Sequence, residues 1–177
     1  MPRSSRILLK ALHPDALAVA RQLQQDFDFD GIKLVLPMTV LAGDVIFREC
    51  TPMGWNGSYE KWFDVLDLII SLDPDVIVPG HGPVSGIEGA MEMKAYLGYV
   101  REESKRCFGQ GLSALEASKR IDFGPYGGWR APARLYMNVE RAYREFRNEA
   151  ADAPWDHAKV LDAMLAVAKA KGIAVEF

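Results

Sequence analysis

The stretch DVIVPGHGP, residues 75–83, joins a short apolar strand to a constrained turn that carries one histidine. Val76, Ile77 and Val78 predict a strand of the kind that is buried in a sheet covered on both faces. Glycines on both sides of His81 permit backbone angles that cost other residues energy, and the flanking prolines stiffen the turn. The imidazole is therefore predicted to lie at the carboxyl end of a strand, where open α/β sheets place ligand-contacting groups. The alternative is a surface turn in which the histidine is incidental.

A second candidate lies in the apolar stretch LAGDVIF, residues 41–47, which has a carboxylate near its middle. A charged side chain in such a strand needs a metal ion, an ionic partner or exposure to water. Asp44 is therefore a candidate ligand, and the alternatives are an edge strand in which Asp44 faces the solvent or a turn residue after Gly43. The strand is expected to cover residues 39–47, after another short strand at 32–36 from which Pro37 separates it.

Most of the remaining sequence predicts helices. Ser58 is a credible N-cap for a helix that reaches about Leu72. In chain order, helices are expected at 14–27, 58–72, 87–108, 113–121, 132–149 and 154–171, with a small strand or a tail at 173–177. A strand-poor α/β part, residues 1–85, thus precedes a helical part, residues 86–177. Because no Gly/Ser-rich linker separates these parts, residues 1–177 are expected to form a single domain.

The composition is that of a soluble globular protein. Its 177 residues, of which 49% are apolar and 25% charged, are enough for one domain with a sizeable core. A net charge of −3 gives no reason to expect nucleic acid as a partner. The apolar run at residues 7–9 is too short for a signal peptide, and no stretch resembles a membrane span, so a cytoplasmic location is expected. Cys50 and Cys107 form no Cys-x-x-Cys motif and are expected to be buried, reduced thiols.

The order of these motifs resembles the metallo-β-lactamase-fold metallohydrolases. The matching features are Ala42-Gly43-Asp44, Thr51-Pro52, Trp62 with Leu66-Asp67, and residues 75–83. The resemblance is expected to cover about residues 26–147, including much of the helical tail. It implies an α/β fold, here a partial metallo-β-lactamase-type αββα half-sandwich followed by a helical C-terminal extension.

The same resemblance implies a metal site. Asp44 would match the carboxylate that bridges two metal ions, and His81 would match a ligand of the second metal. Zinc is the implied cofactor, because it accepts both nitrogen and carboxylate ligands. In the family, two neighbouring metals activate water for hydrolysis, here of an unknown small-molecule substrate.

The chain departs from the family in its histidines. The His-x-His-x-Asp-His motif is absent, and so is the further histidine that normally precedes the bridging aspartate. The chain has three histidines, His13, His81 and His157, and nothing at metal-ligand spacing accompanies the first or the last. This chain alone therefore cannot build the complete two-metal site. An abrupt junction between Val40 and Leu41 also suggests an internal deletion, so the sequence is interpreted as the C-terminal part of the family's domain.

Three functions are compatible with this sequence. The first is a metallo-β-lactamase-like hydrolase that is inactive or incomplete as an isolated chain, with Asp44 and His81 holding at most one zinc. The second is a non-catalytic remnant that acts as a protein-interaction module, because half of a sandwich leaves an open strand edge and an exposed apolar face. The third is one part of a split hydrolase. The expected partner is a second copy of the chain or a complementing chain, with no role for nucleic acid or membrane.

Overall fold

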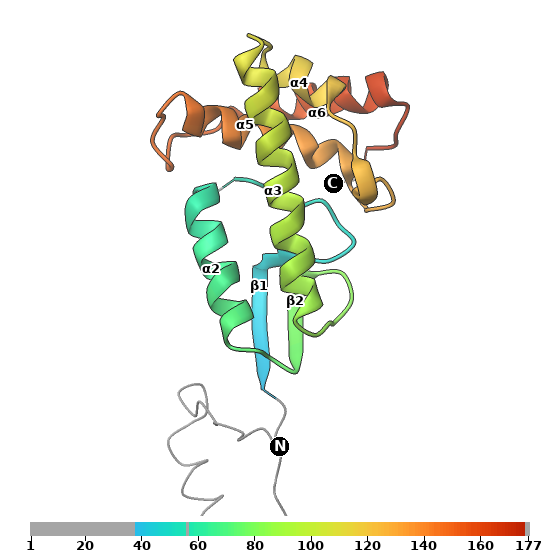
Figure 1. Cartoon of the computed structure of the whole chain (residues 1–177). Coiled ribbons are helices and arrows are strands. Elements are labelled where there is room, and N and C mark those ends of the chain that lie inside the picture. The colour runs from blue at the N-terminus through green and yellow to red at the C-terminus, as the bar shows by residue number, and fades with distance from the viewer. Residues whose placement is uncertain (1–37, 56, 176–177) are drawn as a thin grey trace, which may run out of the picture. The chain divides into compact units, whose positions relative to one another are not determined.

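The computed structural model describes residues 38–55 and 57–175, shown in Figure 1. The chain divides into two compact units, Met1–Met38 and Thr39–Phe177, and the description below concerns the second unit. Three sequence predictions lie outside the described residues, namely the helix at 14–27, the strand at 32–36 and the placement of His13. The prediction of a single domain stays a prediction.

Two parallel strands form the sheet of this unit. Strand β1 spans Thr39–Phe47, strand β2 spans Val76–His81, and helix α2, Tyr59–Ser71, connects them. Parallel neighbours need such a crossover, because the chain must return to the same end of the sheet. The register places Phe47 opposite His81, so the carboxyl ends of both strands lie at one edge of the sheet.

Strand β2 is longer than the sequence predicts. The expected strand ended at Val78, whereas pairing continues through Pro79 to His81. The register shifts on both sides of Gly43, which has a φ of +51°, a backbone conformation that favours glycine. Proline is tolerated in such an irregular ladder because its missing N–H removes no regular hydrogen bond. The histidine therefore ends the strand and does not lie in the turn beyond it.

Helices make up most of the remaining structure. They are α3 (Glu88–Gly109), α4 (Ala114–Arg120), α5 (Leu135–Phe146) and α6 (His157–Lys171), with short 3-10 turns at Gly124–Tyr126 and Pro132–Arg134. The predicted caps Ser58 and Ser113 are confirmed, since each hydroxyl oxygen accepts the backbone N–H of the third helical residue. The helix expected from residue 132 begins only at Leu135, because Ala131 has a φ of +52° and a 3-10 turn follows it. Residues 173–175 have no regular secondary structure.

Helix α3 connects the strands to the helical part of the unit. Figure 1 shows β1, β2 and α2 at one end and α4, α5 and α6 at the other, with α3 running past both groups. Helix α3 contacts β1, α2, α4 and α5, and one cluster of buried apolar side chains extends from the strands to α5. A mixed α/β architecture is therefore confirmed. The described residues contain two strands and five α-helices, and the αββα half-sandwich stays a prediction.

The loop that follows β1 is bonded to α5 by two buried side chains. Asn138, 1% exposed, donates an amide N–H to the Pro52 carbonyl at 3.1 Å. Arg141, 2% exposed, donates from Nε to the Gly54 carbonyl at 3.1 Å and from Nη2 to the Trp55 carbonyl. Buried carbonyls need such donors, so these contacts fix the path of the loop that leaves the end of β1.

Two further expectations bear on the environment of the chain. The helices within residues 38–55 and 57–175 are all too short or too polar to cross a membrane. Cys50 and Cys107 are both buried and free, as the sequence predicts.

Candidate metal centre

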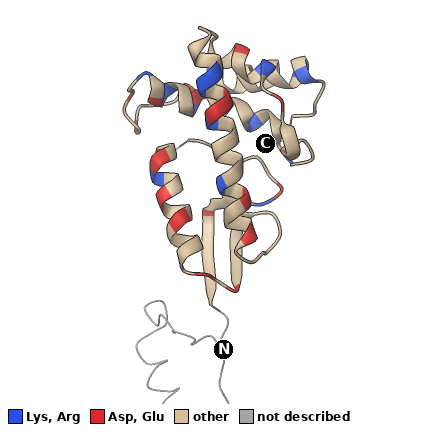
Figure 2. Cartoon of the chain, in the orientation of Figure 1, with Lys and Arg blue, Asp and Glu red and all other residues tan. Residues whose placement is uncertain are grey.

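The parallel pairing of β1 and β2 brings the two candidate ligands together. Asp44 lies towards the carboxyl end of β1, and His81 is the last residue of β2. The Oδ1 atom of Asp44 lies 3.6 Å from the Nε2 atom of His81. The structure thus places the two residues side by side at the carboxyl ends of adjacent strands, where α/β sheets bind ligands. Figure 2 shows no basic residue on either strand, and Asp44 is the one acidic residue within them.

The imidazole of His81 is fixed on one face and accessible elsewhere. It stacks on the buried ring of Phe47, with ring centroids 4.7 Å apart and planes within 9°. The backbone carbonyl of His81 accepts the N–H of Arg48 at 2.9 Å. The His81 side chain nevertheless stays 41% exposed, and the Asp44 side chain is 73% exposed. Such exposure is also what the edge-strand alternative for Asp44 predicts, so solvation alone accommodates its charge.

Two glycines allow the strands to approach closely enough for this contact. A Cβ on Gly80 would lie 2.7 Å from the Gly43 carbonyl carbon and closer still to Asp44 Oδ1. A Cβ on Gly82 would lie 2.7 Å from the Arg48 carbonyl carbon, and Gly82 also has a φ of +89°. The PGHGP motif therefore has a steric function in addition to its turn geometry, because any larger residue would push β2 away from β1.

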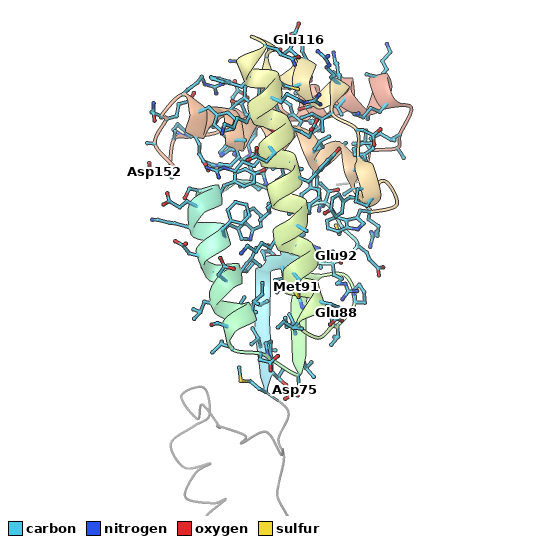
Figure 3. All side chains as sticks on the ribbon, viewed as in Figure 1. Asp75, Glu88, Met91, Glu92, Glu116 and Asp152 are labelled. Carbon is cyan, nitrogen blue, oxygen red and sulfur yellow. The ribbon has the colours of Figure 1, made fainter. Side chains whose placement is uncertain are left out.

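An ion-pair cluster anchors the end of β1 to α3. Arg48, directly after β1, lies 3.2 Å from a carboxylate oxygen of Glu88 and 3.1 Å from one of Glu92. Figure 3 shows Glu88 and Glu92 on the part of α3 that runs alongside the strands. The Arg48 side chain is 20% exposed, so these contacts are partly shielded from solvent. These ion pairs hold Arg48 in place, and the backbone N–H of Arg48 donates to the His81 carbonyl.

The spacing of the two donors fits a zinc ion. Two ligands bonded to a tetrahedral zinc at about 2.0–2.2 Å lie about 3.4 Å from each other. The observed 3.6 Å is close to this value and exceeds the roughly 2.7–2.9 Å of a charge-assisted hydrogen bond. A histidine nitrogen and a carboxylate oxygen are both ordinary zinc ligands. The separation of Asp44 and His81 thus matches that of two zinc ligands, and their role as metal ligands stays a prediction.

The number of donors does not fit a complete zinc site. Within residues 38–55 and 57–175, no group of three or more His, Cys, Asp or Glu side chains could hold a metal ion. Catalytic zinc sites use three protein ligands and structural sites use four. The described part of the chain thus supplies two candidate ligands, Asp44 and His81, which are called the half-site below, and zinc as their metal stays a prediction.

A cavity of about 290 Å³ borders Asp44. Its walls come from β1, the loop after β1 and the start of α2, and they include Phe47, Trp55 and Trp62. The indole N–H of Trp62 donates to the Val45 carbonyl at 2.8 Å, which holds α2 against β1. Such a cavity can receive a small apolar group next to the half-site.

Lys61 is the basic residue among the described residues that line this cavity. The sequence alone does not single out Lys61, because no local pattern reveals that the start of α2 lies beside the end of β1. The same holds for Phe47, which reads as an ordinary apolar strand residue. The places of Lys61 and Phe47 at the site follow only from the crossover that joins the two strands.

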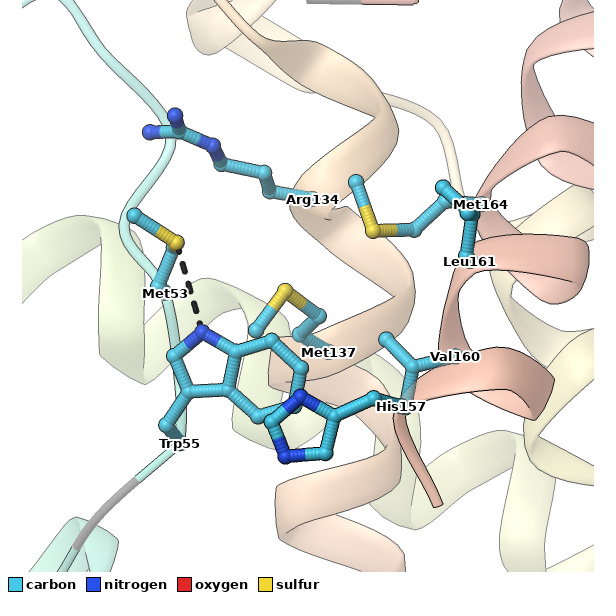
Figure 4. Close-up of a pocket in the computed structure, with 8 residues that line it drawn as sticks. All are labelled: Met53, Trp55, Arg134, Met137, His157, Val160, Leu161 and Met164. Carbon is cyan, nitrogen blue, oxygen red and sulfur yellow. Dashed lines mark hydrogen bonds between the residues drawn. The ribbon is translucent and has the colours of Figure 1, made fainter. Parts of the chain in front are cut away.

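A second cavity, of about 170 Å³, lies between α5, α6 and the loop after β1 (Figure 4). Its lining is largely apolar and includes three methionines, Met53, Met137 and Met164. His157 is exposed at the first turn of α6, as the sequence predicts, and its ring stacks on Trp55 at a centroid distance of 4.9 Å. This stacking contact explains the position of the His157 ring, which has a packing role.

Comparison with known proteins points to the same segment of the chain. No curated protein matches the sequence. One family model matches residues 38–81, which begin just before β1 and end at His81, so the match contains both members of the half-site. It covers less than half of the chain, and the resemblance expected for residues 26–37 and 82–147 stays a prediction. Residues 38–81 thus match the model of the metallo-beta-lactamase superfamily, as the sequence motifs predict.

Proposed function

We propose that this chain is a metallo-β-lactamase-like protein whose Asp44 and His81 form a zinc-binding half-site, and that the isolated chain is not an active hydrolase. The observation that carries the proposal is the 3.6 Å separation of Asp44 Oδ1 and His81 Nε2 at the ends of adjacent strands. The superfamily match of residues 38–81 supports a hydrolase-like ancestry for this segment. The cytoplasm, where both cysteines would stay reduced, is the proposed location.

The residues within 38–55 and 57–175 can bind and orient, but they do not by themselves complete a catalytic site. His81 would bind through Nε2 while Phe47 keeps its ring in place, and Asp44 would add one carboxylate oxygen. A zinc ion bound in such a site supplies Lewis acidity and lowers the pKa of a bound water. The cavity beside Asp44 would receive the apolar part of a small-molecule substrate, whose identity the fold does not fix. With two ligands in place of three, tight zinc binding and water activation are not expected.

A second candidate function is a protein-interaction module or one part of a split hydrolase. The observation in its favour is the exposure of large apolar side chains near the strands. Leu41 on β1 is 78% exposed, Leu68 on α2 is 59% exposed, and Val84 after β2 is 61% exposed. Where exposed apolar side chains of this size lie together, they commonly mark a protein contact. A complementing chain that covers them could also supply the missing ligands.

Zinc titration of the purified full-length chain tests the half-site. Isothermal titration with zinc chloride is expected to show weak binding that His81→Ala and Asp44→Asn both remove. His157→Ala is the matched control, because His157 is also an exposed histidine stacked on an aromatic ring. Binding that survives His81→Ala but not His157→Ala would contradict the assignment.

Hydrolysis assays test the proposed inactivity. The zinc-treated chain is mixed with a chromogenic β-lactam, a thioester and a phosphodiester, and no turnover above the protein-free rate is expected. Turnover that depends on zinc and disappears in His81→Ala would show that the isolated chain completes its own site. That result would overturn the proposed inactivity and leave the zinc ligands as assigned.

A further inference from the structure

The helical part of the chain contains a buried cation that no acidic residue balances. Arg134, the last residue of the 3-10 turn Pro132–Arg134, is 5% exposed. Its Nη1 atom donates to the Thr51 carbonyl at 3.3 Å and to the Cys50 thiol at 3.5 Å. No carboxylate within residues 38–55 and 57–175 forms an ion pair with this guanidinium. Because buried charges are normally paired, the position favours an anion that comes from outside the described residues.

Arg134 also has hydrogen-bonding capacity that the protein does not use. A guanidinium donates from Nε, Nη1 and Nη2, and the buried Arg141 uses all three nitrogens to reach backbone carbonyls. In Arg134, by contrast, Nε and Nη2 have no acceptor among the described residues. Neither nitrogen is one of the sealed, unpaired atoms of that part of the chain, so both can still be reached. Two donors on one edge of a guanidinium suit a carboxylate.

The cavity between α5, α6 and the loop after β1 adjoins this cation (Figure 4). Arg134 lines the cavity, whose other lining side chains are apolar or aromatic apart from His157, and no acidic residue is among the described residues that line it. Its volume of about 170 Å³ is close to the roughly 150 Å³ of an apolar cavity that holds one benzene molecule. The three methionines in the lining suit an aromatic ring, because thioethers adapt in shape and contact ring edges favourably.

Trp55 adds a second donor with a weak partner. Its indole N–H donates to the thioether sulfur of Met53 at 3.3 Å, the dashed line in Figure 4, and both residues line the cavity. A thioether is a weak acceptor, whereas a carboxylate oxygen is a strong one. A bound carboxylate could therefore take this N–H from Met53 at little cost.

The turn that carries Arg134 begins at a strained residue. Ala131 has a φ of +52°, a left-handed conformation that alanine rarely adopts, and its carbonyl accepts the backbone N–H of Arg134 at 3.1 Å. Backbone strain of this kind is often found where a side chain is held for binding.

We infer that this cavity binds a small aromatic carboxylate of about the size of benzoate. Its carboxylate pairs with the guanidinium of Arg134, and its ring lies among the methionines. The inference does not depend on the proposed half-site, because neither Asp44 nor His81 lines this cavity.

Isothermal titration of the full-length chain with benzoate, benzamide and acetate tests the inference. Benzamide keeps the ring without the charge, and acetate keeps the charge without the ring. Benzoate is expected to bind at least about tenfold more tightly than either, since the charged hydrogen bonds and the buried ring both contribute. Equal affinity for benzoate and benzamide would overturn the pairing with Arg134, and equal affinity for benzoate and acetate would overturn the role of the cavity. An absence of benzoate binding would overturn the whole inference and leave the zinc half-site untouched.

Two variants locate the binding. Arg134→Met removes the cation and keeps an unbranched stem, so it should lower benzoate affinity at least about tenfold and change benzamide affinity little. Circular dichroism checks that this variant is folded. Leu161→Glu avoids the buried core, because Leu161 lines the cavity and is 40% exposed, and its negative charge should repel benzoate.

Leu165→Glu is the matched control for the second variant. Leu165 lies one turn further along α6, is 44% exposed and does not line the cavity, so benzoate affinity should stay as in the natural sequence. Benzoate binding that a folded Arg134→Met leaves unchanged would contradict the site. If Arg134→Met does not fold, Leu161→Glu decides: binding as tight as in Leu165→Glu would place benzoate elsewhere and overturn the inference.

Discussion

Gly80 lies directly against Asp44, because the backbone of β2 approaches β1 so closely there that no side chain fits between them. A Cβ added to Gly80 would lie 2.7 Å from the Gly43 carbonyl carbon and nearer still to the Asp44 carboxylate. The residue at position 80 thus affects both the orientation of the Asp44 carboxylate and the pairing of the two strands. The proposed metal binding and the pairing of the strands thus depend on the same glycine.

Gly80→Ala is therefore expected to weaken both properties. The added methyl group must displace the Asp44 carboxylate or part β2 from β1, and such overpacking costs about 1–3 kcal/mol. Urea unfolding followed by circular dichroism measures the stability, and zinc titration measures the site. The matched control is Gly98→Ala on α3, where a Cβ meets nothing within 4 Å. That control should keep or raise stability, by up to about 1 kcal/mol, because alanine favours helix more than glycine. Equal stability of Gly80→Ala and the natural sequence would contradict the steric argument.

The sequence predicted the local elements of the fold because their signals are local. The strand at Thr39–Phe47 follows from its apolar pattern, and the start of α2 follows from the cap Ser58. The neighbourhood of Asp44 and His81 was also predictable, since two parallel strands joined by a helix end at the same edge of a sheet.

The contacts that shape the site could not be predicted in this way. The stacking of Phe47 on His81 depends on the register after a bulge, and the bulge depends on the backbone of Gly43. The position of Lys61 beside the cavity depends on the packing of α2 on β1. These are tertiary relations between residues far apart in sequence, and neither periodicity nor turn residues encode them.

Trp62→Phe is expected to loosen the contact between α2 and β1. The indole N–H of Trp62 donates to the Val45 carbonyl at 2.8 Å, and phenylalanine removes that donor while keeping an aromatic ring. Leaving this partly buried carbonyl without its partner should cost about 1–2 kcal/mol of unfolding free energy. Urea unfolding measures the loss. Leu68→Ala, a change at a 59% exposed side chain of the same helix, should stay within about 0.5 kcal/mol. A smaller loss for Trp62→Phe than for this control would contradict the assigned hydrogen bond.

The capping carboxylate of Glu116 is expected to lower the free energy of unfolding in acid. Its pKa is lowered from the usual 4.5, first by the hydrogen bond from the Ser113 hydroxyl and then by the one from the Ser113 backbone N–H. Because its pKa is lower in the folded state than in the unfolded state, the ionised Glu116 carboxylate contributes to stability. That contribution is fully present above the pKa of the unfolded state and disappears as the pH falls through the pKa of the folded state. Unfolding free energy should therefore decline below about pH 4.5, and Glu116→Gln should make that decline shallower.

Chemical denaturation between pH 6 and pH 3 measures this decline. Ser113→Ala removes the largest cause of the lowered pKa while keeping the carboxylate, so it should flatten the same part of the curve. Parallel curves for the natural sequence and Glu116→Gln would contradict the predicted linkage. The pKa values of Glu88 and Asp156 are lowered in the same direction by backbone hydrogen bonds, so some acid sensitivity should remain in both variants.

Arg141→Met is expected to give the largest loss of stability among these changes, because Arg141 is a buried cation that bonds to backbone carbonyls. It is 2% exposed and donates to the carbonyls of Gly54, Trp55 and Ala151. Burial lowers the pKa of its guanidinium, yet the hydrogen bonds keep the group within the loop contacts. Methionine fills a similar volume without any donor, so the loss should come from carbonyls that are left unsatisfied.

The expected cost is about 2–4 kcal/mol in urea unfolding, since several buried carbonyls lose a charged donor at once. Lys159→Met is the matched control, because its side chain is 82% exposed and it should change stability by less than about 0.5 kcal/mol. The loop that Arg141 holds also borders the cavity beside Asp44, so zinc titration of a still folded Arg141→Met should give weaker binding. Unchanged stability together with unchanged zinc binding would mean that the loop reaches its position without Arg141, and that β1 and α2 alone place the cavity next to the half-site.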